Sequence, residues 1–461
     1  MTARTVGRFS NRMNESDATL WEIESDPRLR STILAIALLN RAPDWTRLQD
    51  RVAQAVKQIP RLRQKVAVAP LNLGPPRWVT DADFDLDYHL RRIVCPDPGD
   101  LRAVFDVAAP MYMEAFDKQR PLWECTLVEG LADGGAAFIQ KVHHSFTDGV
   151  GGMKLADFVL DTTRSPRHSP LRTSVSMPDT SLMAEAVDSA RRAVETTTRL
   201  ARRMPGAAVN ASLHPAAFAR NSIRTAGSIG KLVMPVSAPL SPVMTGRGTA
   251  RRLDAFDLPL RSLREAAHTV SGSVNDAFLT GVTGGMRRYH EVHQAPTDRL
   301  RVTMPINVRG SDDELGNNRF VPARFEIPIV EIDPAERMRH LGALARGWRR
   351  EPSLPFVGII AGALNRLPGP LTTVAMASML KAIDFVATNV PGPKGARYLA
   401  GSKVVAEYAF APPSGAAFAM SLLSFDETAC FGLTIDTVAV PDPLVLTDCM
   451  RQGFAEVLAL A

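Results

Sequence analysis

The chain has 461 residues, of which 45% are hydrophobic and 22% charged, and its formal net charge is +6 at pH 7. This composition excludes a disordered chain, and the length predicts two domains of about 200 residues each. No apolar run approaches the roughly 18 to 20 residues that cross a bilayer, so we expect no transmembrane helix. The N-terminal residues lack the apolar segment of a secretory signal, and we expect the cytosol or its membrane face as the location.

Cysteine usage agrees with a reducing compartment. The four cysteines stand far apart and none belongs to a C-x-x-C pair; they are Cys95, Cys125, Cys430 and Cys449. This spacing argues against a disulfide framework and against a zinc site. We therefore predict reduced, mostly packed thiols and no metal.

Two strands are predicted in the first third of the chain. Pro121, Leu122 and Trp123 lead into an apolar segment that ends at Val128, and a turn-forming Asp-Gly-Gly sequence precedes the strand-like residues 136–142. The pattern predicts an antiparallel pair joined through the glycine turn. Trp123, on physical grounds alone, is a core anchor.

The second of these strands runs into the sequence K-V-H-H-S-F-T-D-G-V-G-G, residues 141–152. Side chains alternate along a strand, so His144 shares a face with Val142, while His143 points to the opposite face with Lys141. The glycines that follow permit a tight turn, and apolar residues at helical spacing predict a helix over 153–160. The expected arrangement is strand, sharp loop, helix.

An imidazole at the end of such a strand suits proton transfer, because its ordinary pKa is about 6.5. The alternative interpretation is structural: one histidine fills a core position, the other is exposed, and Asp148 caps the following helix. The spacing H-H-x-x-x-D-G, completed by Gly149, favours chemistry, because it resembles the signature of the coenzyme A-dependent acyltransferase superfamily. Nonribosomal peptide condensation domains carry the same motif, so it does not choose among the members.

Positive charge is concentrated between Arg164 and Arg252, a stretch that contains fourteen Lys or Arg and only four Asp or Glu. Clusters of Pro and Ser at both ends of this stretch predict an interdomain connection, and residues 182–204, free of Gly and Pro, predict a basic helix within it. The helix could bind anionic lipid headgroups or lie across the protein's own acidic surface. Nucleic acid ranks last, because no recognition motif accompanies the charge.

The second half of the chain contains three further patterns. Ser273 and Asp276, with Asn275 between them, form a capping box that predicts the start of a helix at 277–282. Residues 302–309 predict a strand that ends in the cation Arg309. Residues 384–393, which end in N-V-P-G-P, predict a strand that runs into a rigid turn.

Taken in order, these elements resemble the bacterial bifunctional wax ester synthase/diacylglycerol acyltransferase family over nearly the whole chain. The resemblance rests on P-L-W at 121–123, H-H-x-x-x-D-G at 143–149, N-D at 275–276, N-V-P-G-P at 389–393 and T-I-D at 434–436. It departs from the family pattern near the N-terminus. Members usually show S-P-x-D where this chain has N-E-S-D at 14–17, and a Met-His pair where it has L-R-S-T at 29–32, although Asp17 and the L-W-E-I-E sequence at 20–24 fit.

The resemblance implies an α/β fold of two coenzyme A-dependent acyltransferase-like domains, each a mixed sheet flanked by helices, with a substrate tunnel between them. We expect an N-terminal domain over residues 1–163, a basic interdomain linker over 164–250 and a C-terminal domain over 251–461. The implied activity transfers a long-chain acyl group from acyl-coenzyme A to diacylglycerol or a fatty alcohol. It uses acyl-coenzyme A as a co-substrate and no other cofactor, and the enzyme could contact a membrane or lipid droplet peripherally.

The resemblance also implies the roles of individual residues. His144 is the expected general base, His143 supports it, and Asp148 is structural, with Arg309 as its candidate ion-pair partner. Two alternatives stay open: transfer to another hydroxyl or amine acceptor, and a catalytically silent protein that binds lipid surfaces. The altered N-terminal stretch leaves the acceptor undetermined.

Overall fold

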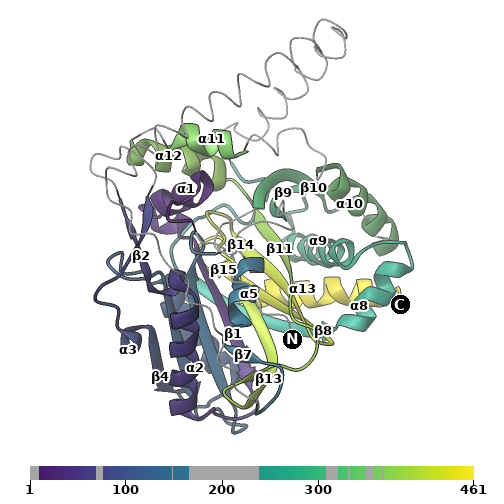
Figure 1. Ribbon diagram of the computed structural model, residues 1–461. Coiled ribbons are helices and arrows are strands. Elements are labelled where there is room, and N and C mark those ends of the chain that lie inside the picture. Colours follow the sequence, from purple (N-terminus) through teal and green to yellow (C-terminus); the bar gives the residue numbers. More distant parts are fainter. Residues whose placement is uncertain are drawn as a thin grey trace, which may run out of the picture.

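Two mixed β-sheets form the framework of the protein, and helices pack against both of them (Figure 1). The computed structural model describes residues 10–68, 76–147, 149–165, 238–307, 320–330, 333–348, 357–365 and 368–461. A separate two-stranded sheet consists of β2 (Gln64–Ala67) and β3 (Arg77–Thr80). Mixed sheets flanked by helices agree with the predicted α/β class.

The first sheet has seven strands in the order β4-β5-β6-β1-β13-β12-β7. Only β4 and β5 are parallel, and the other neighbours are antiparallel. The strands are β1 (Thr32–Leu39), β4 (Leu90–Val94), β5 (Trp123–Glu129), β6 (Ala136–His143), β7 (Leu160–Asp161), β12 (Tyr398–Leu399) and β13 (Ser402–Phe410). The predicted hairpin is confirmed, because β5 pairs with β6 antiparallel from Trp123 opposite Val142 to Glu129 opposite Ala136.

The second sheet has six strands in the order β10-β9-β11-β14-β15-β8. Its centre is parallel, since β11 runs alongside both β9 and β14, and its remaining pairs are antiparallel. The strands are β8 (Arg251–Pro259), β9 (Arg299–Asn307), β10 (Phe320–Pro328), β11 (Phe385–Pro391), β14 (Phe418–Phe425) and β15 (Thr428–Asp436). The strand expected over 384–393 is present as β11 with slightly different bounds, and the strand expected over 302–309 is present as β9, although its last two predicted residues lie outside the described ranges.

The helices pack around the sheets and against one another (Figure 1). They are α1 (Glu15–Ile23), α2 (Trp45–Gln58), α3 (Leu86–His89), α4 (Leu101–Met113), α5 (Gly149–Ala156), α8 (Leu260–His268), α9 (Val274–Val292), α10 (Pro334–Trp348), α11 (Val357–Leu364), α12 (Gly369–Leu380) and α13 (Pro443–Leu458), with short 3-10 turns at Pro27–Leu29 and Pro60–Arg63. Helix α9 contacts α8, α10 and α13, and α1 contacts α11 and α12. Helix α4 joins the two sheets, because it contacts β1 and β6 of the first and β8 of the second.

Sheet membership does not follow the order of the chain. Strands β12 and β13 come from the C-terminal part of the sequence, yet they lie in the first sheet between β1 and β7. The division into residues 1–163, 164–250 and 251–461 stays a prediction, and it does not by itself describe which strands share a sheet. The predicted basic helix over 182–204 lies outside the described residues.

The helix after the histidine motif begins earlier than the sequence predicted. The expectation was a helix over 153–160, but α5 spans Gly149–Ala156, and Leu160 already belongs to β7. Three glycines therefore lie within the helix, although glycine disfavours helix interiors. Tertiary contacts outweigh this local preference, and α5 contacts β11 of the second sheet.

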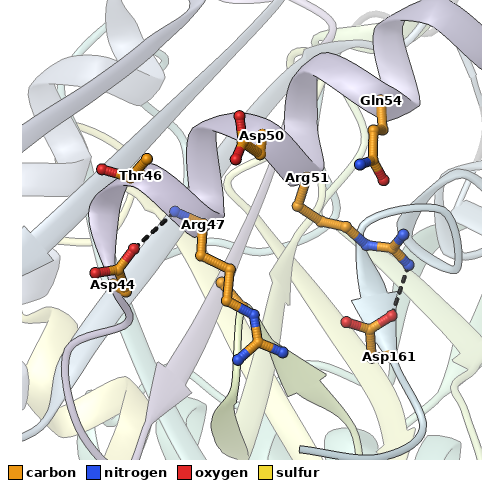
Figure 2. A pocket seen from close by; sticks show the side chains of 8 residues that line it. Asp44, Thr46, Arg47, Asp50, Arg51, Gln54 and Asp161 are labelled. Carbon is orange, nitrogen blue, oxygen red and sulfur yellow. Dashed lines mark hydrogen bonds and ion pairs between the residues drawn. The ribbon is translucent and has the colours of Figure 1, made fainter. Parts of the chain in front are cut away.

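A hollow of about 440 Å³ lies where α2 faces the edge of the first sheet (Figure 2). Its lining is Asp44, Thr46, Arg47, Asp50, Arg51, Gln54, Asp161 and Ala400. Asp44 accepts the backbone N–H of Arg47 at 2.8 Å, and Arg51 pairs with Asp161 at 2.7 Å. These contacts cap α2 and fasten it to β7, so the hollow belongs to the helix attachment and not to the histidine motif.

Glu407 is a buried acid in the middle of β13. It lies opposite Ala37 of β1 and is 1% exposed. No hydrogen-bond partner for its Oε2 is found in the described residues. Burial raises the pKa of Glu407 from 4.5 to about 7, because the charged form has lost its solvation.

This shift predicts a stability change with pH that the substitution Glu407→Gln removes. The folded state holds a proton that the unfolded chain releases near pH 4.5, so the stabilisation is complete below that pH and is lost as the pH rises to about 7. Between pH 4.5 and 8 the wild-type free energy of unfolding should fall by roughly 3 kcal/mol relative to that of E407Q. Urea unfolding of both proteins across this range measures the difference, and parallel curves would contradict the assignment.

Candidate active site

The end of β6 places the two histidines against the N-terminal residues of β1. In the pairing of β1 with β6, His143 lies opposite Thr32. The backbone N–H of His143 donates to the carbonyl of Leu122 at 3.1 Å, and that of His144 donates to the carbonyl of Ser31 at 2.7 Å. Both backbones are therefore fixed by strands on either side before the chain turns into α5.

The two imidazoles occupy different environments, as strand alternation predicted. His143 is 0% exposed and Lys141, on the same face, is 2% exposed. Val142 and His144, on the other face, are both half-buried. Of the two histidines, only His144 is therefore partly exposed.

His143 is held by polar contacts on both ring nitrogens. Its Nε2 lies 3.0 Å from Glu24 Oε1, and its Nδ1 lies 3.0 Å from the backbone N of Ser145 and 2.6 Å from the Ser145 hydroxyl. A backbone N–H can only donate, so Nδ1 accepts and Nε2 carries the hydrogen that faces Glu24. His143 is thus assigned as a neutral imidazole with a fixed tautomer.

Aromatic side chains enclose this ring. Trp21 and Phe116 both meet it edge to face, at centroid distances of 5.9 and 6.0 Å. Lys141 Nζ lies 4.4 Å from the centroid of Phe116 and 3.6 Å from Glu124 Oε1, and burial lowers the pKa of this lysine. The site therefore combines apolar packing with charges that are paired on the buried face of the strand.

The electrostatics of Glu24 favour its ionised form. Burial acts to raise the pKa of this carboxyl. The contact with His143, the N–H of Ser31 and the charge of Lys118 act in the opposite direction and outweigh burial, so the net pKa lies below its ordinary value of 4.5. Sequence reasoning noted Glu24 only as part of a stretch that fits the family pattern. The sequence held no local signal that this carboxylate meets His143, because the two residues lie on different elements.

The P-L-W residues support the motif from beside it. Pro121, Leu122 and Trp123 are all buried, and Trp123 is 4% exposed. Trp123 Nε1 donates to the carbonyl of Leu62 at 2.8 Å, and its ring stacks on His89 at 4.5 Å. Trp123 is the core anchor that the sequence predicted.

The predicted capping box is confirmed at the start of α9. The Ser273 hydroxyl accepts the N–H of Asp276, and the Asp276 carboxylate accepts the N–H of Ser273. Arg346 lies 3.7 Å from this carboxylate, which is largely buried. Asn275, the neighbouring site candidate, is half-buried in the first turn of α9. The contacts of Asp276 are therefore those of a helix cap.

Two other parts of the predicted set lie in the second sheet. Asn389 belongs to β11, the strand that α5 contacts, so the segment after the histidines meets the strand that carries N-V-P-G-P. Asp436, at the end of β15, is 1% exposed and pairs with Arg251 at 3.1 Å while it accepts the N–H of Gly248 at 2.8 Å. Asp436 fastens the beginning of β8.

Gly149 is the first residue of α5. Asp148 and Arg309 lie outside the described residues, so their ion pair stays a prediction. Within the described ranges, no group of three or more His, Cys, Asp or Glu could hold a metal ion. None of the helices in those ranges combines the length and apolar character that a membrane crossing requires.

Comparison with known proteins identifies the family. The model of the wax ester synthase/diacylglycerol acyltransferase catalytic domain matches residues 13–278, and the model of the C-terminal domain of the same family matches residues 316–457. The chain therefore belongs to the wax ester synthase/diacylglycerol acyltransferase family of acyltransferases. A Mycobacterium tuberculosis (strain H37Rv) protein named "Putative diacyglycerol O-acyltransferase" is 34% identical over 469 residues, which cover 98% of this chain and 93% of the relative.

Solved structures share the fold. The wax ester synthase/diacylglycerol acyltransferase from Marinobacter aquaeolei VT8 superposes with a TM-score of 0.63 at 21% identity, over 97% of this chain and 98% of that one. The starter condensation domain of rhizomide synthetase, solved with C8-CoA and Leu-SNAC, gives a TM-score of 0.61 at 11% identity, over 98% and 94% of the two chains. The predicted pair of acyltransferase-like domains is confirmed as a fold.

The buried pair of Asp436 and Arg251 predicts a stability effect that is separate from chemistry. Asp436→Ala should lower the free energy of unfolding by about 3 to 5 kcal/mol, because it leaves Arg251 buried without its counter-charge. Urea unfolding measures the loss. The control is Arg261→Ala, which removes a solvent-exposed pair with Glu265 and should leave the unfolding midpoint unchanged. Equal effects of the two substitutions would show that burial does not matter here.

Proposed function

We propose that this enzyme transfers a long-chain acyl group from acyl-coenzyme A to the hydroxyl of diacylglycerol or of a fatty alcohol. The products are triacylglycerol or a wax ester, with coenzyme A released. Family membership over most of the chain and the names of the mycobacterial relatives support this reaction. The solved condensation domain that binds C8-CoA supports acyl-coenzyme A as the donor for this fold.

The observation that carries the proposal is the difference between the two histidines. His143 is fully buried with both nitrogens engaged, whereas His144 is half-buried at the end of the same strand. A general base must reach the proton that it removes. His144 is therefore our candidate base, and His143 is a support on the other face of the strand.

The proposed reaction proceeds by direct attack. His144 removes the proton from the acceptor hydroxyl as that oxygen attacks the thioester carbonyl carbon. The tetrahedral oxyanion that forms then collapses, the carbon–sulfur bond breaks, and the coenzyme A thiolate takes up the proton from the imidazolium. This route needs no acyl-enzyme, and all four cysteines are free thiols, of which three are buried.

The contact between α5 and β11 supports a reaction site between the two halves of the protein. We propose that the donor and the acceptor approach His144 along a tunnel between the domains. Asp148 holds the loop through an ion pair, with Arg309 as the candidate partner, and acts structurally. Peripheral contact with the inner face of the plasma membrane or with a lipid droplet would bring the enzyme to its apolar acceptors, and the basic linker is the proposed contact.

An acceptor panel tests the reaction. Purified enzyme given oleoyl-coenzyme A should acylate dioleoylglycerol or hexadecanol, because the proposed acceptor is an apolar alcohol. Thin-layer chromatography of a labelled acyl chain identifies the ester. Acylation of only a polar hydroxyl or an amine would instead favour the alternative acceptor class, and thioester cleavage without ester formation would contradict both.

Substitution of the base tests the mechanism. His144→Ala should lower kcat by about 100- to 10,000-fold, the usual contribution of a general base, with little effect on folding. Release of free thiol measures the rate, and thermal unfolding checks the fold. The lipid-surface alternative predicts that neutral-lipid accumulation in cells is the same with this variant as with the wild type.

Asp148→Ala distinguishes a structural aspartate from a proton carrier. Loss of a buried ion pair should destabilise the protein by roughly 3 to 5 kcal/mol, so soluble yield and unfolding midpoint should fall together with rate. A variant of full stability that loses only rate would overturn the structural role.

A further inference from the structure

Glu24 contacts two groups that set the position of the proposed base. Its Oε1 lies 3.0 Å from Nε2 of His143 and accepts the backbone N–H of Ser31 at 3.2 Å. The carbonyl of the same Ser31 accepts the backbone N–H of His144 at 2.7 Å. One carboxylate therefore holds the ring of the first histidine and, through one residue, the backbone of the second.

The surroundings leave this carboxylate little freedom. Glu24 caps the C-terminus of α1, and its side chain is 6% exposed. Trp21, on the same helix, packs edge to face against His143, and Lys118 lies 4.4 Å from the centroid of the Trp21 ring. Glu24 thus accepts one backbone hydrogen bond and lies within contact distance of the His143 ring in a packed setting, and a buried charge held in this way has little freedom to move.

We infer that Glu24 is a positioning residue, which holds His143 as the Nε2–H tautomer and anchors the backbone of His144 through Ser31. This inference rests on the proposed role of His144 as the base. The side chain of Ser145 completes the chain of contacts at Nδ1 of His143, and its 0% exposure makes it a partner of the ring and not a nucleophile. The element that carries Glu24 therefore contributes to the reaction without contact to substrate.

Two substitutions at Glu24 separate the loss of its hydrogen-bond acceptor oxygen from a change in packing alone. Glu24→Ala removes the contacts with Ser31 and His143 and should lower kcat by about 10- to 100-fold with the KM for acyl-coenzyme A unchanged, because a small misplacement of the base slows the chemical step. Glu24→Gln keeps a carbonyl oxygen for the His143 and Ser31 N–H groups and should retain most of the wild-type kcat. The matched control is Glu407→Gln, the same change at a buried glutamate in β13 that lies opposite Ala37 of β1.

A spectroscopic readout without substrates keeps this test independent of the proposed reaction. In protein labelled with ¹⁵N in its nine histidines, His143 should show a protonated Nε2 and an unprotonated Nδ1, with assignments from His143→Gln and His144→Ala. Glu24→Ala should shift the signals of both histidines, while Glu24→Gln preserves the tautomer and Glu407→Gln leaves both signals in place.

Three results would overturn the positioning role. They are a protonated Nδ1 on wild-type His143, a folded Glu24→Ala protein with wild-type kcat, and a Glu24→Gln protein as impaired as Glu24→Ala. If instead His144→Ala retained full activity, the proposed mechanism would fail, and the histidine spectra would still decide whether Glu24 fixes the ring of His143 and the backbone of His144.

Discussion

The antiparallel pairing of β1 with β6 is the constraint on which the site depends. It runs without a break from Thr32 opposite His143 to Leu39 opposite Ala136, and it sets which face each histidine occupies. A shift by one residue would exchange those faces, because side chains alternate along a strand. The buried contacts of His143 and the backbone bond of His144 to Ser31 both require the observed register.

The same strand also joins the two halves of the molecule. On its other side β1 pairs with β13, which comes from the C-terminal part of the chain. Strand β13 approaches β15 so closely that a Cβ on Gly432 would lie 2.1 Å from the carbonyl oxygen of Ala409, and only glycine fits there. The first sheet is therefore complete only when β12 and β13, from the C-terminal part of the chain, have joined it.

Two buried cations in the described part of the chain each have a carboxylate partner. Lys141 pairs with Glu124, and Arg251 pairs with Asp436. The two charges of such a pair lose their hydration on burial, and the pair fixes the relative position of the two side chains. The loss of either partner leaves a buried charge uncompensated. Glu407 is the contrasting case, since burial raises its pKa to about 7 and it holds a proton at mildly acidic pH.

The sequence by itself determined the features whose signals are local. Strand alternation assigned opposite faces to His143 and His144, the glycine turn predicted the β5–β6 hairpin, and Ser273 with Asp276 predicted the cap of α9. Only the tertiary structure decided that β13 completes the first sheet, that α5 begins at Gly149, and that Glu24 meets His143. Periodicity and capping act over a few residues, whereas these contacts join segments that are distant in the chain and depend on packing of the whole fold.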